Sequence, residues 1–562
     1  MNGSQAIWNL LEKAGVKYVF GNPGTTELPM TDTLVDHPTI QYIMGLQEVP
    51  VMAMADGYAM ASRQVGVVNL HISCGLGNAM GMLYNAYREG TPLLVTAGQQ
   101  DRRLAFEEPI LWSDMVQVAR PWTKWAVEVQ RPEDLPTAIR RAVQVALMPP
   151  TGPVFLSIPV DLQTAVAEFD LTAPRPINPR IRPPVEELQR AAQLLAGAKN
   201  PGLLIGSRVV EADGVGPLVR LAELLGAPVI SESGTTHGRL SFPSNHPLYA
   251  PGLPLWSPEI RERLQAFDVL FVVGMDLLRL YVYHEPARAV PEHIRLIHLD
   301  ADPYQLGKNY PIEVGLVGDY QAGLQELVEL LGKTQTEEQR TAANLRAKHY
   351  AQQHRELLDE LLQRADEQRD TRPLTPLTLM HSLAEALPPK TAVIEEAVTT
   401  TGTYLERLGK LVDPTGYFGH RGWALGWGLG SFLGVKLAWP DRPVLAVLGE
   451  GAAMYGIQGL WTAAKYKIPV TFVICNNAQY QILKIGARSA ELPAAMAGKY
   501  LGMDLSGPEV DFVGLAQSLG VSAQRVTNPD ELTSLVGESL QGSEPRLFDV
   551  PIQRGTPNRL NY

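Results

Sequence analysis

The stretch VLAVLGEGAAMYGIQGLWTAAKYKIPVTFVICNNAQY, residues 444–480, decides the fold of this chain. Residues 444–448 and 470–474 are continuous apolar runs of strand length, and residues 457–466 between them have helical composition. The first run ends at Gly449-Glu450-Gly451 and the second at Asn476-Asn477. Because a right-handed βαβ crossover brings the carboxyl ends of both strands to one sheet edge, we expect Glu450 and Asn477 to be neighbours.

This pair of turns has the oxygen ligands that a metal-bound diphosphate needs. A carboxylate, an amide oxygen and phosphate oxygens can together form the octahedron that Mg²⁺ prefers, and glycines let backbone amides approach an anion. The stretch therefore predicts a magnesium–diphosphate site. Taken alone, Gly-x-Gly is more often an ordinary strand–helix turn than a cofactor site, so the rest of the chain has to decide.

Length and composition indicate a globular protein of several domains. The chain has 562 residues, of which 45% are hydrophobic and 19% charged, and its net charge of -11 disfavours nucleic acid and anionic membranes as partners. No apolar run reaches about 18 residues, and the N-terminus has no basic segment followed by an apolar one, so we expect no membrane partner. Cys74 and Cys475 both fall in segments predicted to be buried, which favours a reducing cytoplasm.

Alternating strand and helix patterns predict an α/β fold with three doubly wound parallel-sheet domains, at residues 1–172, 185–333 and 372–562. The first and third share a plan of short strand, glycine-rich turn and small-residue helix. We expect a proline-rich linker at 173–184, an exposed connecting helix at 334–370, and glycine turns at 72–78 and 449–451. The turn after the strand 18–20 is expected to expose Thr25, Thr26 and Glu27.

The stretch 444–480 resembles the cofactor signature of thiamine-diphosphate enzymes, Gly-Asp-Gly followed by Asn-Asn, with Glu450 in place of the aspartate. The segments FGNPGTTELP (20–29), LQE (46–48), NLH (69–71) and GNAMG (77–81) are similar in order and spacing to the benzoylformate decarboxylases, within the decarboxylase and acetolactate synthase superfamily. The resemblance extends through all three domains. The longer side chain of Glu450 leaves open how well Mg²⁺ binds, because this ion tolerates little deviation in distance.

The resemblance assigns roles in the first domain and around the substrate. Glu48 would hydrogen-bond the pyrimidine of the cofactor, and its apolar neighbours predict a raised pKa; alternatively it is a glutamate favoured at a helix N-terminus. Thr25 would contact the substrate carboxylate, and His71 would relay protons, although a histidine at a strand end is more often structural. Where the family has a second catalytic histidine this chain has Tyr281, and the sequence leaves open which of three side chains donates a proton: Tyr281, His284 or His420. The cation in His420-Arg421 suggests an additional carboxylate or polar group in the substrate.

The resemblance also implies the cofactor contacts of the third domain. The metal ligands would be Glu450, Asn477 and the backbone carbonyl of Gln479. Leu425 would be the apolar wedge that bends the cofactor, or else a plain core leucine. The remaining cofactor contacts would be Glu396, Thr399, Thr400, Gly422, Gly449, Gly451, Ala452 and Tyr480.

The resemblance implies non-oxidative decarboxylation of a 2-keto acid, benzoylformate-like with an aromatic or bulky side chain, to an aldehyde and CO₂. The cofactors would be thiamine diphosphate and Mg²⁺, and the enzyme a homo-oligomer, a homotetramer built as a dimer of dimers, with the cofactor between subunits. One alternative is a carboligase similar to acetolactate synthase or to a 2-hydroxyacyl lyase; another is a cofactor-binding protein without turnover. The sequence leaves open which keto acid is used and whether the middle domain binds a nucleotide.

Overall fold

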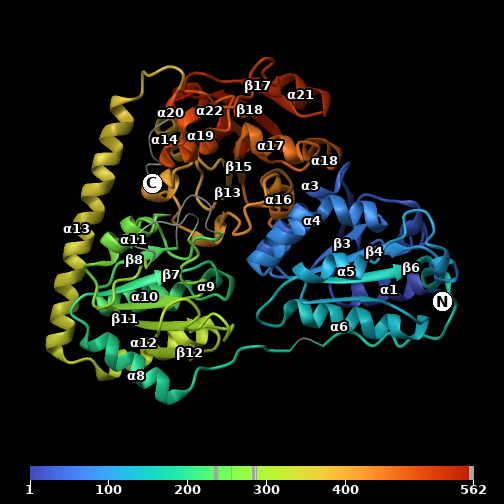
Figure 1. Ribbon diagram of the computed structural model, residues 1–562, viewed down its shortest axis with the longest axis horizontal. Coiled ribbons are helices and arrows are strands. Elements are labelled where there is room, and N and C mark those ends of the chain that lie inside the picture. Colours follow the sequence, from blue (N-terminus) through green and yellow to red (C-terminus); the bar gives the residue numbers. More distant parts are fainter. Residues whose placement is uncertain (176, 233–237, 255, 281–284, 286–287, 556–562) are drawn as a thin grey trace.

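The computed structural model describes residues 1–562 apart from 176, 233–237, 255, 281–284, 286–287 and 556–562. Its strands form three six-stranded parallel sheets, one in each of three α/β domains (Figure 1). This architecture confirms the predicted fold class. Among the described residues, none of the helices has the length and apolar character that crossing a membrane requires.

The first sheet has the strand order β2-β1-β3-β4-β6-β5. Its strands are β1 (Tyr18–Gly21), β2 (Gln41–Met44), β3 (Gly66–Leu70), β4 (Leu93–Gln99), β5 (Trp125–Glu128) and β6 (Val154–Pro159). The helices of this domain are α1 (Gly3–Lys13), α2 (Leu28–Leu34), α3 (Glu48–Ser62), α4 (Ile72–Glu89), α5 (Met115–Ala119), α6 (Leu135–Leu147) and α7 (Val160–Thr164).

The third sheet has the order β14-β13-β15-β16-β18-β17, which matches the first sheet when strands are counted from the first one in each. Its strands are β13 (Ala392–Glu396), β14 (Tyr417–Phe418), β15 (Val444–Gly449), β16 (Thr471–Asn476), β17 (Ser522–Arg525) and β18 (Arg546–Pro551). Its helices are α14 (Pro376–Ala386), α15 (Tyr404–Arg407), α16 (Trp427–Ala438), α17 (Glu450–Gly456), α18 (Gly459–Lys465), α19 (Gln481–Ser489), α20 (Pro493–Met496), α21 (Phe512–Ser518) and α22 (Pro529–Leu540). The shared order is the common plan that the sequence indicated.

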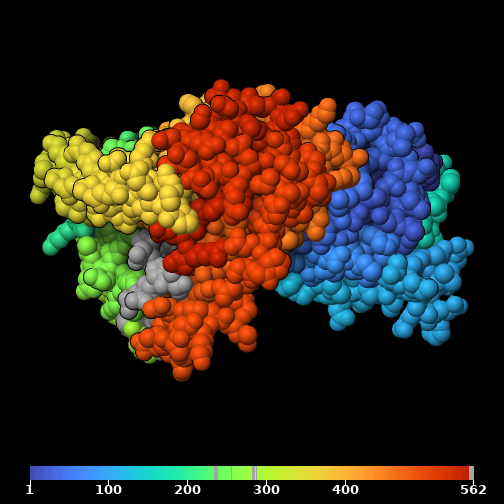
Figure 2. Space-filling view, turned by 90° about the horizontal axis from the view of Figure 1, so that it is seen from above, coloured from blue at the N-terminus to red at the C-terminus, as the bar shows by residue number. Residues whose placement is uncertain are grey.

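The middle sheet has a different order, β12-β11-β10-β7-β8-β9. Its strands are β7 (Pro201–Ile205), β8 (Val229–Ser231), β9 (Tyr249–Ala250), β10 (Val269–Val273), β11 (Arg295–Asp300) and β12 (Val314–Val317), and its helices are α8 (Val185–Gly197), α9 (Arg208–Glu211), α10 (Val215–Leu225), α11 (Ser257–Leu264) and α12 (Tyr320–Thr334). The long helix α13 (Glu337–Glu367) joins this domain to the third and runs along the outer edge of the molecule (Figures 1 and 2).

The first and third domains share one hydrophobic core, centred on the crossing of α3 and α16. The two backbones touch, because a Cβ added to Gly434 would lie 1.9 Å from the carbonyl oxygen of Met54. A Cβ added to Gly57 would lie 2.2 Å from the carbonyl oxygen of Ser431. Only glycine allows this approach, so the orientation of the two domains depends on these positions.

Two predicted glycine turns are wrong. α4 begins at Ile72 and α17 at Glu450, so residues 72–78 and most of 449–451 are helical. The helical penalty of a glycine is about 1 kcal/mol, which tertiary packing readily exceeds. Cys74, on the first turn of α4, is exposed and not buried as predicted. Strands β5 and β17 were not predicted, because their side chains are mostly half-buried and carry no continuous apolar pattern.

Substituting Gly434 with alanine is expected to reduce the free energy of unfolding by about 1–3 kcal/mol, because an added methyl group must displace backbone atoms of α3. Urea-induced unfolding would measure the change. The matched control is Gly486→Ala in α19, where a Cβ would meet no atom within 4 Å and a small stabilisation is expected. Equal stability of both variants would contradict the close crossing.

Candidate active site

The carboxyl edge of the third sheet brings together Glu450, Asn477 and Gln479. Glu450 begins α17 directly after β15, and Asn477 follows β16, which pairs in parallel with β15. The backbone N–H of Gln479 donates to Oε1 of Glu450 at 3.0 Å and to Oδ1 of Asn477 at 3.1 Å. The βαβ geometry inferred from the sequence therefore brings these groups together, although Glu450 and Gln479 are 29 residues apart in the sequence.

These residues fit a hard divalent cation. The carboxylate of Glu450, the amide oxygen of Asn477 and the carbonyl of Gln479 are all oxygen donors, which suits Mg²⁺. Burial raises the pKa of Glu450 to about 7, and the N–H of Gln479 only partly offsets this, so a bound cation would stabilise the charged carboxylate. Among the described residues, no three His, Cys, Asp or Glu side chains converge on a metal site, so this mixed oxygen set is the candidate that the chain offers.

Glu48 begins α3 at the corresponding edge of the first sheet. It is buried, and its two carboxylate oxygens each accept one amide hydrogen bond, Oε1 from Asn22 at 3.2 Å and Oε2 from Asn78 at 2.9 Å. Both asparagines belong to segments that were quoted for the family resemblance, but neither was predicted as a partner of Glu48. Two amide donors fix the carboxylate without neutralising it by a cation.

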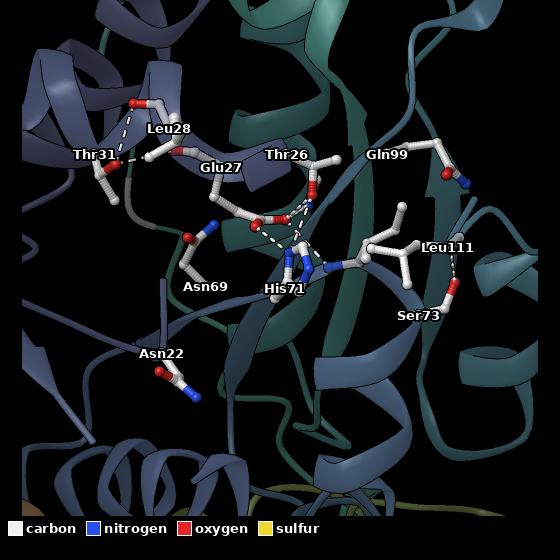
Figure 3. Close-up of polar contacts among 12 residues, drawn as sticks. Asn22, Thr26, Glu27, Leu28, Thr31, Asn69, His71, Ser73, Gln99 and Leu111 are labelled. Atoms are coloured by element: carbon white, nitrogen blue, oxygen red, sulfur yellow. Dashed lines mark hydrogen bonds and ion pairs between the residues drawn. The ribbon is translucent and has the colours of Figure 1, made fainter. Parts of the chain in front are cut away.

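His71 forms a tight pair with Glu27 (Figure 3). Its Nδ1 lies 2.9 Å from Oε2 of Glu27, while Oε1 of the same carboxylate accepts the backbone N–H groups of Gly98 and Ile72 at 2.8 and 3.2 Å. Glu27 has no exposed surface, whereas the imidazole is 22% exposed. A carboxylate that is itself held by several donors keeps a fixed position, so its contact with Nδ1 orients the histidine ring.

The predicted exposure of the first turn is wrong for two of its three residues. Thr25 is exposed, but Thr26 and Glu27 are buried. The hydroxyl of Thr26 donates to Glu27 at 2.7 Å and lies 3.4 Å from Nδ1 of His71. The turn forms a short 3-10 helix over Thr25–Glu27, in which Thr26 and Glu27 are buried. The sequence signal for Glu27 was its place in a glycine turn, but its pairing with His71 depends on β1 and β3 being neighbours.

The loop before α16, residues 422–425, is anchored by side chains from two domains. Asn85 of α4 donates to the carbonyl of Ala424 at 2.8 Å and accepts its N–H at 3.0 Å. A Cβ on Gly422 would lie 2.2 Å from Oδ1 of Asn85, so glycine is required there. The side chain of Leu425 is half-buried. Glu396 is fully buried and caps the start of α16, accepting three N–H groups at 2.9–3.0 Å from Gly426, Trp427 and Gly428.

This loop also contacts the start of α3 within the same chain. A Cβ on Gly426 would lie 3.2 Å from Cγ1 of Val49, the residue after Glu48. The first turn of α3 and the loop after Gly422 are therefore neighbours, although far apart in the sequence.

His420 and Arg421, which precede the loop, do not face open space. His420 is buried; its Nδ1 accepts the N–H of Trp423 at 2.9 Å, and its Nε2 lies 3.5 Å from Oε1 of Glu396. Arg421 is buried against Glu89, with Nε 3.3 Å from Oε2. The sequence interpretation that this cation reads a second polar group of the substrate is therefore not supported, because its charge is already compensated inside the chain.

The remaining predicted residues divide into two groups. Tyr281 and His284 lie outside the described residues. Thr400 is buried and Thr399 half-buried in the turn after β13, on the same sheet edge as Glu450. Gly451 lies against the ring of Tyr480, since a Cβ added to it would lie 2.6 Å from Cε1. Gly449 precedes Glu450, and Ala452 lies on the first turn of α17.

Three residues with a positive φ lie at these loops. Ile72, Trp423 and Ala478 are not glycines, yet they have φ values of 35°, 63° and 51°. They follow His71, Gly422 and Asn477. Each such conformation costs of the order of 1–3 kcal/mol and persists where surrounding contacts impose it, often at functional sites.

The comparisons with known proteins agree with this geometry. The family described as thiamine pyrophosphate enzyme matches in three parts, the N-terminal TPP binding domain at residues 1–114, the central domain at 188–327 and the C-terminal TPP binding domain at 397–550. The chain belongs to the thiamine pyrophosphate enzyme family.

Individual relatives show which members of the family the chain is similar to. The chain is 34% identical to benzoylformate decarboxylase of Pseudomonas aeruginosa, with 98% of this chain and 99% of that protein covered. It is 28% identical to a probable acetolactate synthase large subunit of Methanocaldococcus jannaschii, with 98% and 92% covered. The solved structure of a thiamine diphosphate-dependent 4-hydroxybenzoylformate decarboxylase of Rhodococcus jostii matches with a TM-score of 0.86 at 29% identity, covering 99% of this chain and 100% of that one.

Glu27→Gln is expected to lower kcat about 10- to 100-fold with benzoylformate as the test substrate, because the amide no longer holds the His71 ring in the same orientation. His71→Ala is expected to cost about 10²–10⁴-fold, the usual contribution of a proton-transferring group. Steady-state kinetics at saturating thiamine diphosphate and Mg²⁺ would measure both. The control is Glu12→Gln, since Glu12 pairs with His37 at 3.2 Å away from these loops. An unchanged kcat in the Glu27 variant would contradict the proton-relay role of the pair.

Glu450→Gln is expected to weaken Mg²⁺-dependent binding of thiamine diphosphate by at least about 100-fold, more than the loss of an outer-shell partner, because the only carboxylate of the set is removed. Glu450→Asp, which restores the family residue, is expected to retain binding. Isothermal titration with and without Mg²⁺ would compare them. Binding by the glutamine variant at the parent affinity would exclude Glu450 as a metal ligand.

Proposed function

We propose that this chain catalyses the thiamine-diphosphate- and Mg²⁺-dependent, non-oxidative decarboxylation of a 2-keto acid with an aromatic or other bulky side chain, releasing an aldehyde and CO₂. The observation that carries the proposal is the His71–Glu27 pair, a partly exposed proton-transferring group at the edge of the first sheet. Full-length similarity to benzoylformate decarboxylase supports the same reaction.

The residues of the chain have separate tasks in this proposal. When bound, thiamine diphosphate supplies the electron sink that decarboxylation requires. Glu450, Asn477 and the carbonyl of Gln479 would hold Mg²⁺ and, through it, the diphosphate. Glu48, oriented by its two asparagine partners, would bind the pyrimidine ring, and Leu425 would support the ring from the loop before α16. The turn at Thr399 and Thr400 would line the phosphate side.

His71 is oriented to move a proton on the substrate side. With Oε2 of Glu27 at 2.9 Å, the proton of a neutral imidazole lies on Nδ1, a tautomer inferred from this contact. Nε2 is then left to accept or deliver the proton that aldehyde formation needs. Thr25, exposed on the same turn, would contact the substrate carboxylate. His420 has both ring nitrogens engaged, which favours a positioning role over proton donation.

The wall that would face the substrate leaves room for a large side chain. In α19, Leu483 is 49% exposed and Gly486 has open space where a Cβ would lie. Large apolar side chains are also exposed at Phe106, Ile110 and Leu501. The homo-oligomer, a dimer of dimers, is proposed from the family resemblance, and exposed apolar side chains such as these are ones that a subunit contact would cover.

A second candidate is a carboligase, in which a second carbonyl compound replaces the proton. The acetolactate synthase relative is the observation that favours it. The oriented, partly exposed imidazole of His71 supports protonation and release of an aldehyde over this alternative.

The purified chain with thiamine diphosphate and Mg²⁺ is expected to release CO₂ and benzaldehyde in equal amounts from benzoylformate. Glu48→Gln is expected to lower this rate by at least about 100-fold, because the pyrimidine loses an acid partner. Coupled alcohol dehydrogenase and CO₂ assays would measure both products, and pyruvate would be tested in parallel. CO₂ release accompanied by a 2-hydroxy ketone or acetolactate in place of free aldehyde would select the carboligase.

A further inference from the structure

All three domains meet directly behind the loop that precedes α16. Arg421 comes from the third domain and Glu89 from the last residue of α4 in the first domain. Oε2 of Glu89 accepts the backbone N–H of Arg421 at 3.0 Å as well as its Nε, and Nη2 of Arg421 donates to the carbonyl of Glu89 at 2.6 Å. One glutamate thus holds both the side chain and the backbone of Arg421.

The middle domain contributes a segment that reaches this point. The carbonyl of Gly238 accepts the N–H of Gly419 at 2.7 Å, and a Cβ on Gly238 would lie 2.9 Å from Oε1 of Glu89 and 3.1 Å from Cγ of Arg421. Gly238 has a φ of 60°, a conformation that favours glycine. Leu240 packs into the hydrophobic core of the third domain.

Arg239 joins the same three domains through backbone carbonyls. Its Nε donates to Tyr417 at 3.0 Å and its Nη2 to Thr415 at 2.6 Å, both just before the loop. Its Nη1 donates to Met60 at 3.1 Å, near the end of α3. The helix that begins with Glu48 and the strand that leads into the loop are therefore tied to one middle-domain side chain.

Charge decides which carboxylate holds Arg421. Burial alone would raise the pKa of Glu89, but the charge and N–H groups of Arg421 outweigh burial and lower it. Burial raises the pKa of two other nearby carboxyls, Glu211 and Glu232, to about 7, despite the charge of Arg421. Of these three glutamates, Glu89 makes the direct contact with Arg421, with Oε2 3.3 Å from Nε, and it is the one whose pKa is lowered. Removing one partner of such a buried pair leaves an uncompensated charge.

We propose that Glu89 and Arg421 are positioning residues that hold the loop at residues 422–425 in the conformation that binds thiamine diphosphate. The loop is attached on one side through Arg421 and on the other through Asn85, and both partners lie on α4. If the pair is removed, the loop populates other conformations, and the apparent Kd rises by the inverse of the competent fraction. The proposal rests on the proposed placement of the cofactor against this loop.

The test is the apparent Kd of thiamine diphosphate for full-length protein stripped of cofactor and titrated in saturating Mg²⁺, followed by tryptophan fluorescence. Glu89→Ala/Arg421→Ala removes both charges, so it is expected to fold while the Kd rises at least about tenfold, as a competent fraction near one tenth requires. Arg421→Lys, which keeps the charge, is expected to give a smaller rise than Arg421→Ala. A Kd of the double variant within twofold of the parent would overturn the proposal.

Two controls separate positioning from general effects. Arg63→Ala/Asp213→Ala removes another ion pair between the first and middle domains, which does not touch the loop, and is expected to leave the Kd within twofold. An equal rise in this control would overturn the proposal, since the effect would come from domain packing. Leu425→Ala is expected to raise the Kd if the cofactor lies against the loop. An unchanged Kd in Leu425→Ala would overturn the placement of the cofactor and this inference with it. A raised Kd in Leu425→Ala together with an unchanged Kd in the double variant would overturn only the role of Glu89 and Arg421.

Discussion

The close crossing of α3 and α16 is the constraint on which the site depends. Each helix starts at a loop that the cofactor would contact, α3 at Glu48 and α16 just after Leu425. Glycines at the crossing bring the backbones into contact, and Nε1 of Trp427 donates to the buried carboxylate of Asp56 at 2.6 Å. Because both helices are rigid, their crossing sets the distance between the two loops at their N-termini.

Buried carboxylates position the rest of the site. Glu27 holds His71 and two backbone N–H groups, Glu396 holds the first N–H groups of α16, and Glu89 holds Arg421. In each case an acceptor satisfies donors on a segment distant in sequence. A buried carboxylate without such donors would be costly, so each one stabilises a single arrangement of the loop that it contacts. One strained residue of these loops, Ile72, is held by such a contact, since its N–H donates to Glu27.

The sequence predicted those parts of the fold and site that depend on local pattern. Continuous apolar runs located the central strands, and the topology of a βαβ unit was enough to bring Glu450 next to Asn477. The sequence did not predict the pairs Glu27–His71, Asn85–Ala424 and Glu89–Arg421. The first depends on β1 and β3 being neighbours, and the other two join residues 339 and 332 positions apart. No periodicity carries information about contacts between separate domains. The buried side chains of Thr26 and Glu27 and the helical glycines after His71 were missed for a related reason, since packing overrode local propensity.

The sequence by itself determined the family, the three parallel sheets and the oxygen donors at the edge of the third sheet, because these follow from motif order and hydrophobic pattern. Only the tertiary structure decided which charges are available for chemistry. It paired Arg421 inside the chain, engaged both nitrogens of His420, and left His71 partly exposed with an oriented ring. The physical reason is that the state of an ionisable group depends on its burial and its partners, and distant elements of the chain supply both.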